Sequence, residues 1–134
     1  MEYEFLEHTA DIKFRARGGT KEEAFESALL AFSHYVSKGS KIKSRKIRKI
    51  EVEGDDFENL LYNFIDELIY LIDAENFVVR KGEVKIDGMR LNAELWGDDA
   101  SNYSELEHVK AATYAEMYVK KKGKNWEVQM VLDV

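Results

Sequence analysis

The sequence predicts a single α+β domain in which a mostly antiparallel sheet packs against two helices. A length of 134 residues is that of one ordinary domain. Two stretches have the apolar spacing of amphipathic helices, and the chain ends in two consecutive hairpin patterns, which form antiparallel pairs. Strands and helices grouped in this way favour a layered α+β fold over a doubly wound one. We therefore expect residues 1–134 to form one domain.

The first strand and the first helix follow each other closely. Apolar and basic residues alternate from Ile12 to Arg17, which predicts a half-buried strand. Thr20 and Glu23 have the spacing of a capping box, and Lys38 with Gly39 is a typical helix end. The apolar residues between these ends recur at intervals of three and four, on one helical face: Phe25, Ala28, Leu29, Phe32, Tyr35 and Val36.

The second helix has the strongest periodic pattern in the chain. After a short strand at Ile50 and Val52, either Asp55 or Asp56 can cap the helix. Its apolar stripe predicts a central packing element: Phe57, Leu60, Leu61, Phe64, Ile65, Leu68, Ile69 and Ile72. The polar side carries four residues that are either a solvated face, which we favour, or a ligand set: Asp66, Glu67, Tyr70 and Asp73.

The last third of the chain predicts two hairpins separated by a loop. Asp87-Gly88 suits a type I′ turn between strands at 78–86 and 91–95. Lys122-Gly123 is the expected turn between strands at 109–119 and 126–132. Between the hairpins, residues 97–107 are acidic and poor in apolar side chains, so we expect a mobile acidic loop.

Composition excludes several classes of function. The chain has no cysteine, which rules out disulfides, zinc-thiolate sites and thiol catalysis. No apolar run approaches the ~20 residues of a membrane span, and residues 1–4 do not resemble a signal peptide, so we expect a soluble cytoplasmic protein. Neither a glycine-rich phosphate loop nor a nucleophile elbow is present.

Charge is unevenly distributed around a net value of −6. A basic run from Lys38 to Lys49 is followed at once by an acidic run from Glu51 to Glu58. The basic run either meets phosphates or an acidic partner, or is a solvated linker that leads into an edge strand protected by its lysines. We favour the second interpretation because no aromatic residues interleave with the lysines to stack bases.

Polar residues gather at the two ends of the chain. Glu7, His8, Thr9 and Asp11 precede the first predicted strand, and Asp133-Val134 follows the last. If these two strands are neighbours in one sheet, Asp11, Asp133 and the terminal carboxylate converge on a cation. The simpler alternatives are that Asp11 caps a turn, that Asp133 is an exposed strand end and that His8 is a hydrogen-bonded structural histidine.

Four stretches together resemble the archease family: residues 7–12, 60–73, 109–114 and 131–134. They span almost the whole chain in the family's order. The resemblance implies a small accessory factor, without catalytic residues of its own, for the tRNA-splicing RNA ligase that joins ends bearing a 2′,3′-cyclic phosphate or a 3′-phosphate. Such a factor promotes guanylylation of the ligase's catalytic histidine, enables multiple turnover and can broaden the nucleotide that the ligase accepts.

The same resemblance implies roles for particular residues. Asp11, Asp133 and the main-chain oxygen of Val134 would bind calcium, and hard oxygen ligands also suit other hard divalent cations. Lys110 would meet a phosphate or an acidic group of the ligase, although a surface pair with Glu107 or with a loop aspartate is the simpler alternative. Glu7 and His8 would support the same partner-binding surface. Family members often carry histidine after the Thr-Tyr pair, whereas this chain has Ala115.

Two other functions compete with that of a ligase activator. One is a metal-dependent phosphoesterase that uses Asp11 and Asp133 as ligands and His8 as general base. The other is a small RNA-binding module that uses the basic run from Lys38 to Lys49. The sequence leaves open a monomer or a weak oligomer.

Overall fold

The computed structural model describes residues 2–6 and 11–134. The elements in chain order are β1 (Glu2–Leu6), β2 (Ile12–Gly18), α1 (Lys21–Ser37), β3 (Lys46–Glu53), α2 (Phe57–Glu75), β4 (Phe77–Asp87), β5 (Arg90–Asp99), the 3₁₀ turn η1 (Ala100–Asn102), β6 (Ala111–Lys122) and β7 (Asn125–Asp133). The predicted α+β class with two helices is therefore confirmed. Strand β1 was not among the predicted strands.

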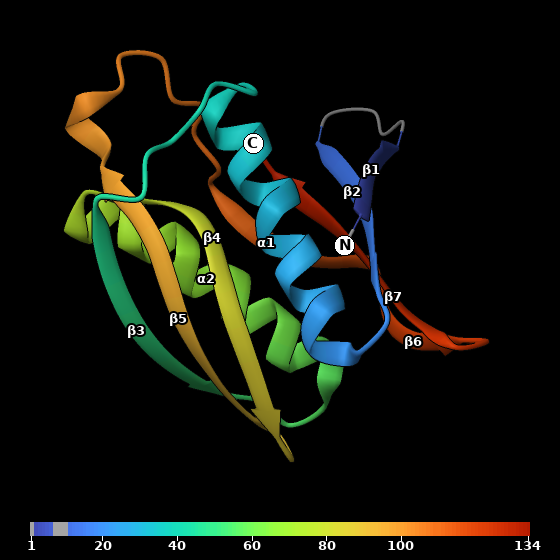
Figure 1. Cartoon of the computed structure of the whole chain (residues 1–134). Helices are drawn as coiled ribbons and strands as arrows, with labels where there is room; N and C mark the ends of the chain where they lie inside the picture. The colour runs from blue at the N-terminus through green and yellow to red at the C-terminus, as the bar shows by residue number, and fades with distance from the viewer. Residues whose placement is uncertain (1, 7–10) are drawn as a thin grey trace.

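The strands form two antiparallel sheets rather than the single sheet we expected. One sheet has the order β1-β2-β7-β6 and the other has the order β3-β5-β4. Both helices lie between the sheets, since α1 packs against β2 and β4 while α2 packs against β6, β3 and β4 (Figure 1). Alternation of apolar residues shows which strand face is buried but not which strands pair. The buried strand faces could therefore be predicted from the sequence, whereas the division of the strands into two sheets could not.

The core between the layers is aromatic and aliphatic. Five phenylalanines from both sheets and both helices are completely or almost completely buried: Phe14, Phe25, Phe32, Phe64 and Phe77. Their convergence joins all the layers into one hydrophobic core. No helix in the described part of the chain is long and apolar enough to cross a membrane.

The predicted helix ends are confirmed. The Thr20 hydroxyl accepts a hydrogen bond from the Glu23 amide at 3.1 Å, and Lys38 ends α1 in a left-handed conformation with φ of 55°. At α2, Asp56 rather than Asp55 is the cap, because its carboxylate accepts from the Asn59 amide at 2.7 Å.

Both hairpin turns lie one residue later than predicted. Asp87 pairs with Arg90 as the last pair of the β4–β5 ladder, so the two-residue loop is Gly88-Met89. Gly88 has a φ of 61° and Met89 is not left-handed, which is the pattern of a type II′ turn rather than type I′. The second loop is likewise residues 123–124 in place of 122–123.

The segment 97–107 is less loop-like than expected. Gly97, Asp98 and Asp99 belong to β5, and residues 100–102 form η1. The Asp98 side chain is buried and accepts a 2.7 Å hydrogen bond from the Tyr103 hydroxyl. Burial alone would raise the pKa of Asp98, but the hydrogen bonds that it accepts lower it. The predicted mobile loop is thus fixed at its start by a buried carboxylate.

Candidate functional site

One end of the four-stranded sheet brings together residues from three distant parts of the chain. Strands β2 and β7 are neighbours, with Ile12 opposite Leu132. Continuing this antiparallel register by one residue sets Asp11 opposite Asp133. On the other side of β7, Ala111 lies opposite Asp133, and the Lys110 amide donates a 2.8 Å hydrogen bond to the Asp133 carbonyl. We call Asp11, Lys110, Asp133 and Val134 the sheet-end cluster.

The surroundings of the sheet-end cluster fix its backbone and leave its side chains accessible. Val134 is half-buried and packs against the hydrophobic core, and Ile12 and Leu132 beside it do the same. Lys110 and Asp133 are exposed, and Asp11 is half-buried. Glu7 and His8, which were predicted to support this surface, lie outside the described residues.

The cluster has the donor chemistry of a hard cation site but few protein ligands. Carboxylate and main-chain oxygens suit calcium, which takes about six to eight oxygen ligands. Among residues 2–6 and 11–134, no three or more His, Cys, Asp or Glu side chains come together as a ready-made metal site. A cation held by Asp11, Asp133 and Val134 would therefore complete its shell with water or with groups of a partner.

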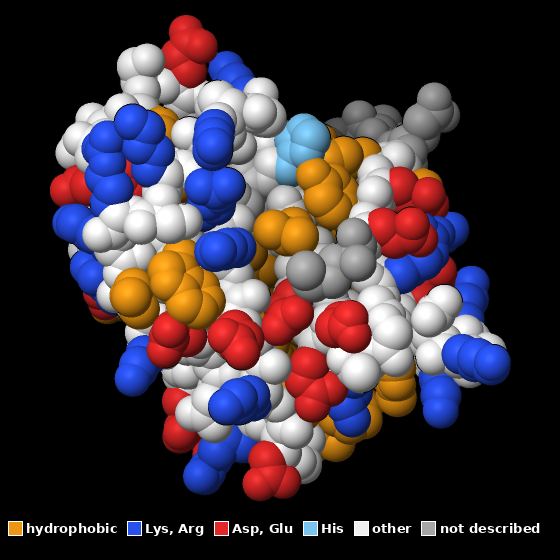
Figure 2. Space-filling view, viewed as in Figure 1, with side chains coloured by type: hydrophobic (Ala, Val, Ile, Leu, Met, Phe, Trp, Pro, Cys, Tyr) orange, Lys and Arg blue, Asp and Glu red, His pale blue; other side chains and the backbone are white. Residues whose placement is uncertain are grey.

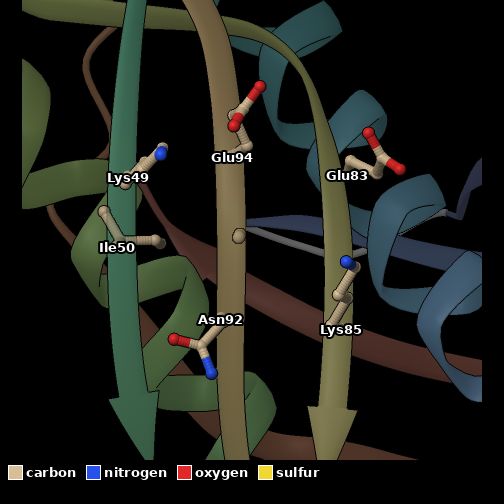
Figure 3. Close-up of a pocket in the computed structure, with 7 residues that line it drawn as sticks. Lys49, Ile50, Glu83, Lys85, Asn92 and Glu94 are labelled. Atoms are coloured by element: carbon tan, nitrogen blue, oxygen red, sulfur yellow. The ribbon is translucent and has the colours of Figure 1, made fainter.

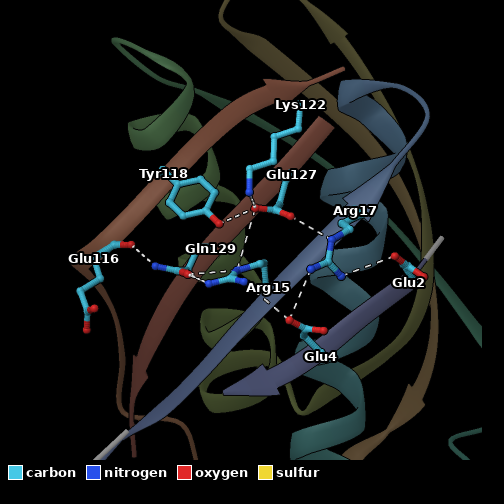
Figure 4. A network of polar contacts seen from close by, with 9 residues as sticks. All are labelled: Glu2, Glu4, Arg15, Arg17, Glu116, Tyr118, Lys122, Glu127 and Gln129. Carbon is cyan, nitrogen blue, oxygen red and sulfur yellow. Dashed lines mark hydrogen bonds and ion pairs between the residues drawn. The ribbon is translucent and has the colours of Figure 1, made fainter. Parts of the chain in front are cut away.

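The outer face of the same sheet carries a network of charged and polar side chains centred on Glu127 (Figure 4). Its carboxylate accepts from Arg17 Nε at 2.9 Å and from the Tyr118 hydroxyl at 2.5 Å, and Lys122 Nζ lies 3.0 Å away. Only 4% of Glu127 is exposed. We call Glu127 and these three partners the Glu127 network.

Electrostatics at Glu127 follow from these contacts. Burial alone would raise the pKa of Glu127, but hydrogen bonds from Tyr118, Lys122 and Arg17 outweigh it and lower the pKa to about 2. Burial, together with the Glu127 carboxylate, raises the pKa of Tyr118 to about 12. The carboxylate is therefore ionised and the phenol is protonated across the physiological range.

Further contacts connect the Glu127 network to all four strands of the sheet. Arg17 also reaches Glu4 of β1 at 3.3 Å. Arg15 donates to the Gln129 side chain at 2.8 Å, and Gln129 donates to the Glu116 carbonyl at 2.7 Å. These cross-strand contacts hold the register that sets Asp11 beside Asp133.

Comparison with known proteins places these features in a family. The sequence profile described as "Archease protein family (MTH1598/TM1083)" matches residues 3–134, almost the whole chain. The chain belongs to the archease family. Its relatives include "Protein archease" of Pyrococcus abyssi, 40% identical over 98% of each chain, and that of Pyrobaculum neutrophilum, 41% identical over 99% of this chain and 95% of the relative.

Solved archease-family structures have the same fold. The solution structure of Methanobacterium thermoautotrophicum protein 1598 matches with a TM-score of 0.83 and 29% identity over 98% of each chain. A Thermotoga maritima protein described as "an archease, possible chaperone" matches with a TM-score of 0.66 over 96% of this chain and 94% of its own, but at 19% identity it supports the fold alone.

The archease-like segment 109–114 leads into an irregular part of β6. The register shifts between Thr113 and Tyr118, so that the residues between them bulge out, and Glu116 has a φ of 52°. Tyr114 stacks on Tyr62 of α2 with ring centroids 4.3 Å apart and accepts a 2.7 Å hydrogen bond from Asn59. The bulge, which includes Ala115, is thereby held against α2.

The structure bears on two alternatives from the sequence. Glu107 pairs with Lys38 at 3.1 Å, and no ion pair joins it to Lys110 among the described residues. On α2, Asp66, Tyr70 and Asp73 are exposed, Glu67 is half-buried, and His108 lies 3.7 Å from Asp73. The exposure of three of these four residues agrees with the solvated face that we favour.

Sequence reasoning missed the Glu127 network. The alternation of β7 marks Glu127 and Gln129 as facing away from the core, which is correct. They are nevertheless buried, because the long side chains of Arg15, Arg17 and Tyr118 cover them. The three basic residues on the outer face of β2, Lys13, Arg15 and Arg17, were the signal in the sequence that acidic and amide partners lie on neighbouring strands.

Proposed function

We propose that this chain is an accessory protein that activates the tRNA-splicing RNA ligase in the cytoplasm. In this role it promotes guanylylation of the ligase's catalytic histidine, enables multiple turnover in tRNA processing and broadens the nucleotide that the ligase accepts. Membership of the archease family supports an accessory role. The observation that carries the proposal is the convergence of Asp11, Lys110 and Asp133 at one end of the sheet.

The sheet-end cluster has the chemistry needed to arrange phosphates and metal in a partner's active site. Asp11, Asp133 and the Val134 main-chain oxygen would hold calcium, whose charge would favour the approach of anionic groups when bound. Lys110 is bonded through its amide to Asp133 at the same end of the sheet, and its ammonium would contact a phosphate or a carboxylate of the ligase. Glu7 and His8 would extend this surface.

Activation by positioning requires no reacting group from this chain. Holding reactants in the correct geometry can lower a barrier by roughly 7–11 kcal/mol in the best cases. The cluster is suited to positioning because its backbone is fixed by the β2–β7–β6 ladders while Lys110 and Asp133 are exposed. A phosphoesterase would in addition need a base that activates metal-bound water.

The proposal is tested by single-turnover guanylylation of the ligase with labelled GTP. We expect the parent chain to accelerate the reaction, and Asp11→Asn, Asp133→Asn and Lys110→Ala each to reduce that acceleration at least about tenfold, equivalent to about 1.4 kcal/mol. Asp87→Asn is the matched control, because Asp87 is an exposed carboxylate at the β4–β5 hairpin. Calorimetric titration with calcium should show binding by the parent and by Asp87→Asn but not by Asp133→Asn.

Two results would contradict the proposal. One is no acceleration at any concentration of the parent chain. The other is equal loss in Asp87→Asn and Asp133→Asn, which would indicate general charge effects rather than the cluster. Hydrolysis of a phosphodiester by the parent without ligase, lost in Asp11→Asn, would favour the phosphoesterase alternative.

A further inference from the structure

The outer face of the three-stranded sheet carries an exposed aromatic and aliphatic pair beside free cations. Ile47 of β3 and Lys81 of β4 both lie opposite Trp96 of β5 in the strand register. Ile47 is 53% exposed, Trp96 is half-exposed, and the Lys81 ammonium lies 5.5 Å from the Trp96 ring centroid. The fold thus supplies an aromatic side chain next to the basic run, where the sequence showed none.

A bulge in β4 directs a second cation toward a neighbouring hollow. Val79 lies opposite Gly97 and Lys81 opposite Trp96, which leaves Arg80 as an extra residue. Arg80 lines a surface hollow together with Lys41, Tyr3 and His34. The extra residue of a β-bulge changes the direction in which the local side chains point.

The far side of the hollow is aromatic. Tyr3, Phe5 and His34 form edge-to-face contacts with ring centroids 5.7–5.8 Å apart, and Phe5 is exposed. Figure 2 shows this arrangement on one face of the molecule: two hydrophobic areas, one of them beside a histidine, separated by a group of lysine and arginine side chains.

The cations of this face differ in how far they are neutralised. Four cations of the basic run are paired with carboxylates at 3.1–3.8 Å: Lys38 with Glu107, Arg45 with Asp98, Lys46 with Asp99 and Arg48 with Glu75. Within the described chain, no such ion pair is formed by Lys41, Arg80 or Lys81. Lys43 and Lys49 of the basic run likewise form no such pair among the described residues, so the charge between the two aromatic groups is one part of the unpaired positive charge.

Acidic side chains bound this positive region on its other side. In the next row of the sheet, Lys49 lies opposite Glu94, and Glu94 lies opposite Glu83 (Figure 3). The shallow depression that these residues line has two lysines and two glutamates, Lys49, Lys85, Glu83 and Glu94, so it offers a polyanion no net attraction. A bound polyanion would run from Trp96 past Lys81 and Arg80 toward the hollow.

We propose that this face binds a short segment of single-stranded RNA. Unpaired bases stack on Trp96 and on the aromatic group at Tyr3 and Phe5, and the phosphates between them contact Lys81, Arg80 and Lys41. Alternating aromatic and cationic side chains match alternating bases and phosphates, whereas a duplex offers no unpaired base. The single-stranded polyanion follows from the geometry, and the choice of RNA rests on the proposed function.

Binding should be weak and local because the whole chain carries a net charge of −6. With three phosphate contacts, a plot of the logarithm of the RNA-binding constant against the logarithm of the salt concentration should have a slope of about −2 for a single strand. We expect a Kd on the order of 10–100 µM at low salt, near the range of sequence-independent binding.

The test uses the full chain without ligase, so its failure leaves the guanylylation assay unaffected. The chain has two tryptophans, and Trp126→Phe leaves Trp96 as the sole reporter. Titration with a twelve-nucleotide single-stranded RNA should quench Trp96 fluorescence, and the same strand in a duplex should not. In parallel, anisotropy of the labelled RNA should show at least fivefold weaker binding by Trp96→Ala.

Charge variants separate a specific site from general attraction. Replacing Arg80 and Lys81 together with Gln should abolish measurable binding. Replacing Lys121 and Lys124 together with Gln makes the same charge change at the exposed β6–β7 hairpin and should leave binding within twofold of the parent. Absence of Trp96 quenching at low salt, or equal weakening by both double variants, would overturn the proposal. A polyglutamate peptide that quenched Trp96 as strongly as RNA would overturn it in favour of an acidic protein partner.

Discussion

At the scale of single residues, Glu127 shows how a buried charge organises the outer face of the four-stranded sheet. Its carboxylate is contacted by three donors, Arg17 of β2 and Tyr118 and Lys122 of β6. If one partner is removed, the remaining buried polar groups lose a hydrogen-bond partner. The resulting loss of folding free energy is larger than the net contribution of a single hydrogen bond. The network therefore ties the stability of the sheet to one carboxylate.

We predict that Glu127→Gln lowers the free energy of unfolding by about 2 kcal/mol at pH 7, the usual value of hydrogen bonds to a charged group. The folded pKa of about 2 is below the ordinary value of 4.5, so this stability is present above pH 4.5 and is lost as the pH falls toward 2. Urea unfolding of both chains between pH 7 and pH 2 measures the difference, which should shrink in acid.

The control for Glu127 is Glu105→Gln, an exposed carboxylate in the segment before β6. This change should alter stability by less than about 0.5 kcal/mol at any pH. A constant difference between the parent and Glu127→Gln down to pH 2 would contradict the depressed pKa and would assign the effect to packing alone.

The position of a candidate residue could be predicted where the residue lies at a strand end. It could not be predicted where the residue becomes part of a site only through side chains of a neighbouring strand. Asp11 and Asp133 each border an alternating apolar run, and neighbouring antiparallel strands bring such ends together. Trp96 and Lys81 gave no such signal, because each follows from the register of β4 against β5 and from the bulge at Arg80. Register is a property of strand pairs, and a single sequence shows only the pattern of each strand.

At the scale of elements, helices were predicted more completely than strands. Caps at Thr20 and Asp56 are local hydrogen bonds between residues three apart, so their spacing is visible in the sequence. The bulge of β6 is not visible, because the apolar alternation from Val109 to Val119 is that of a regular strand. At the bulge, Tyr114 contacts Tyr62 and Asn59 of α2. This contact joins residues far apart in the sequence, so the pattern of β6 alone does not reveal it.

The free edge of β4 is protected by a carboxylate of α1. The Val84 amide donates a 2.7 Å hydrogen bond to Glu26 Oε2, although β4 is an outer strand of its sheet. Open strand edges invite pairing with other chains, and an inward-pointing charge prevents it. Burial chiefly, and nearby Glu23 and Glu83, raise the pKa of Glu26.

We predict that Glu26→Gln raises the free energy of unfolding at pH 7 by less than about 1 kcal/mol. A raised folded pKa means that Glu26 contributes stability when protonated and loses that contribution as the pH rises through the folded pKa. The glutamine carbonyl still accepts from Val84 and carries no charge. Urea midpoints at pH 7 and at pH 4 measure the gain, which should vanish in acid.

Glu26→Ala serves as the control, since it removes the acceptor as well as the charge. It should be less stable than Glu26→Gln at pH 7, because the Val84 amide then lacks its partner. Equal stability of the two variants would show that the hydrogen bond to the β4 edge contributes nothing.

At the scale of the whole molecule, the two proposed surfaces are centred on different parts of the fold. The sheet-end cluster lies on β2, β6 and β7. The proposed RNA-binding face runs from Trp96 and Lys81 of the three-stranded sheet past Arg80 to Tyr3 and Phe5 of β1, the strand beside β2 (Figure 1). An activator that contacts a ligase through the sheet-end cluster can therefore hold RNA at Trp96 and Lys81. The two surfaces share no residue, so their contributions should be separable.

We predict that Trp96→Ala and Asp133→Asn affect different steps of ligation. Without RNA, Trp96→Ala should activate guanylylation within twofold of the parent, whereas Asp133→Asn should not activate. In multiple-turnover ligation at limiting RNA, Trp96→Ala should raise the RNA concentration needed for half-maximal rate, because RNA capture is weakened. The free-energy effects of the double variant should add within about 0.5 kcal/mol, as expected for distant sites without shared partners. Slow guanylylation by Trp96→Ala without RNA would instead show that the three-stranded sheet faces the ligase, and the two surfaces would then form one interface.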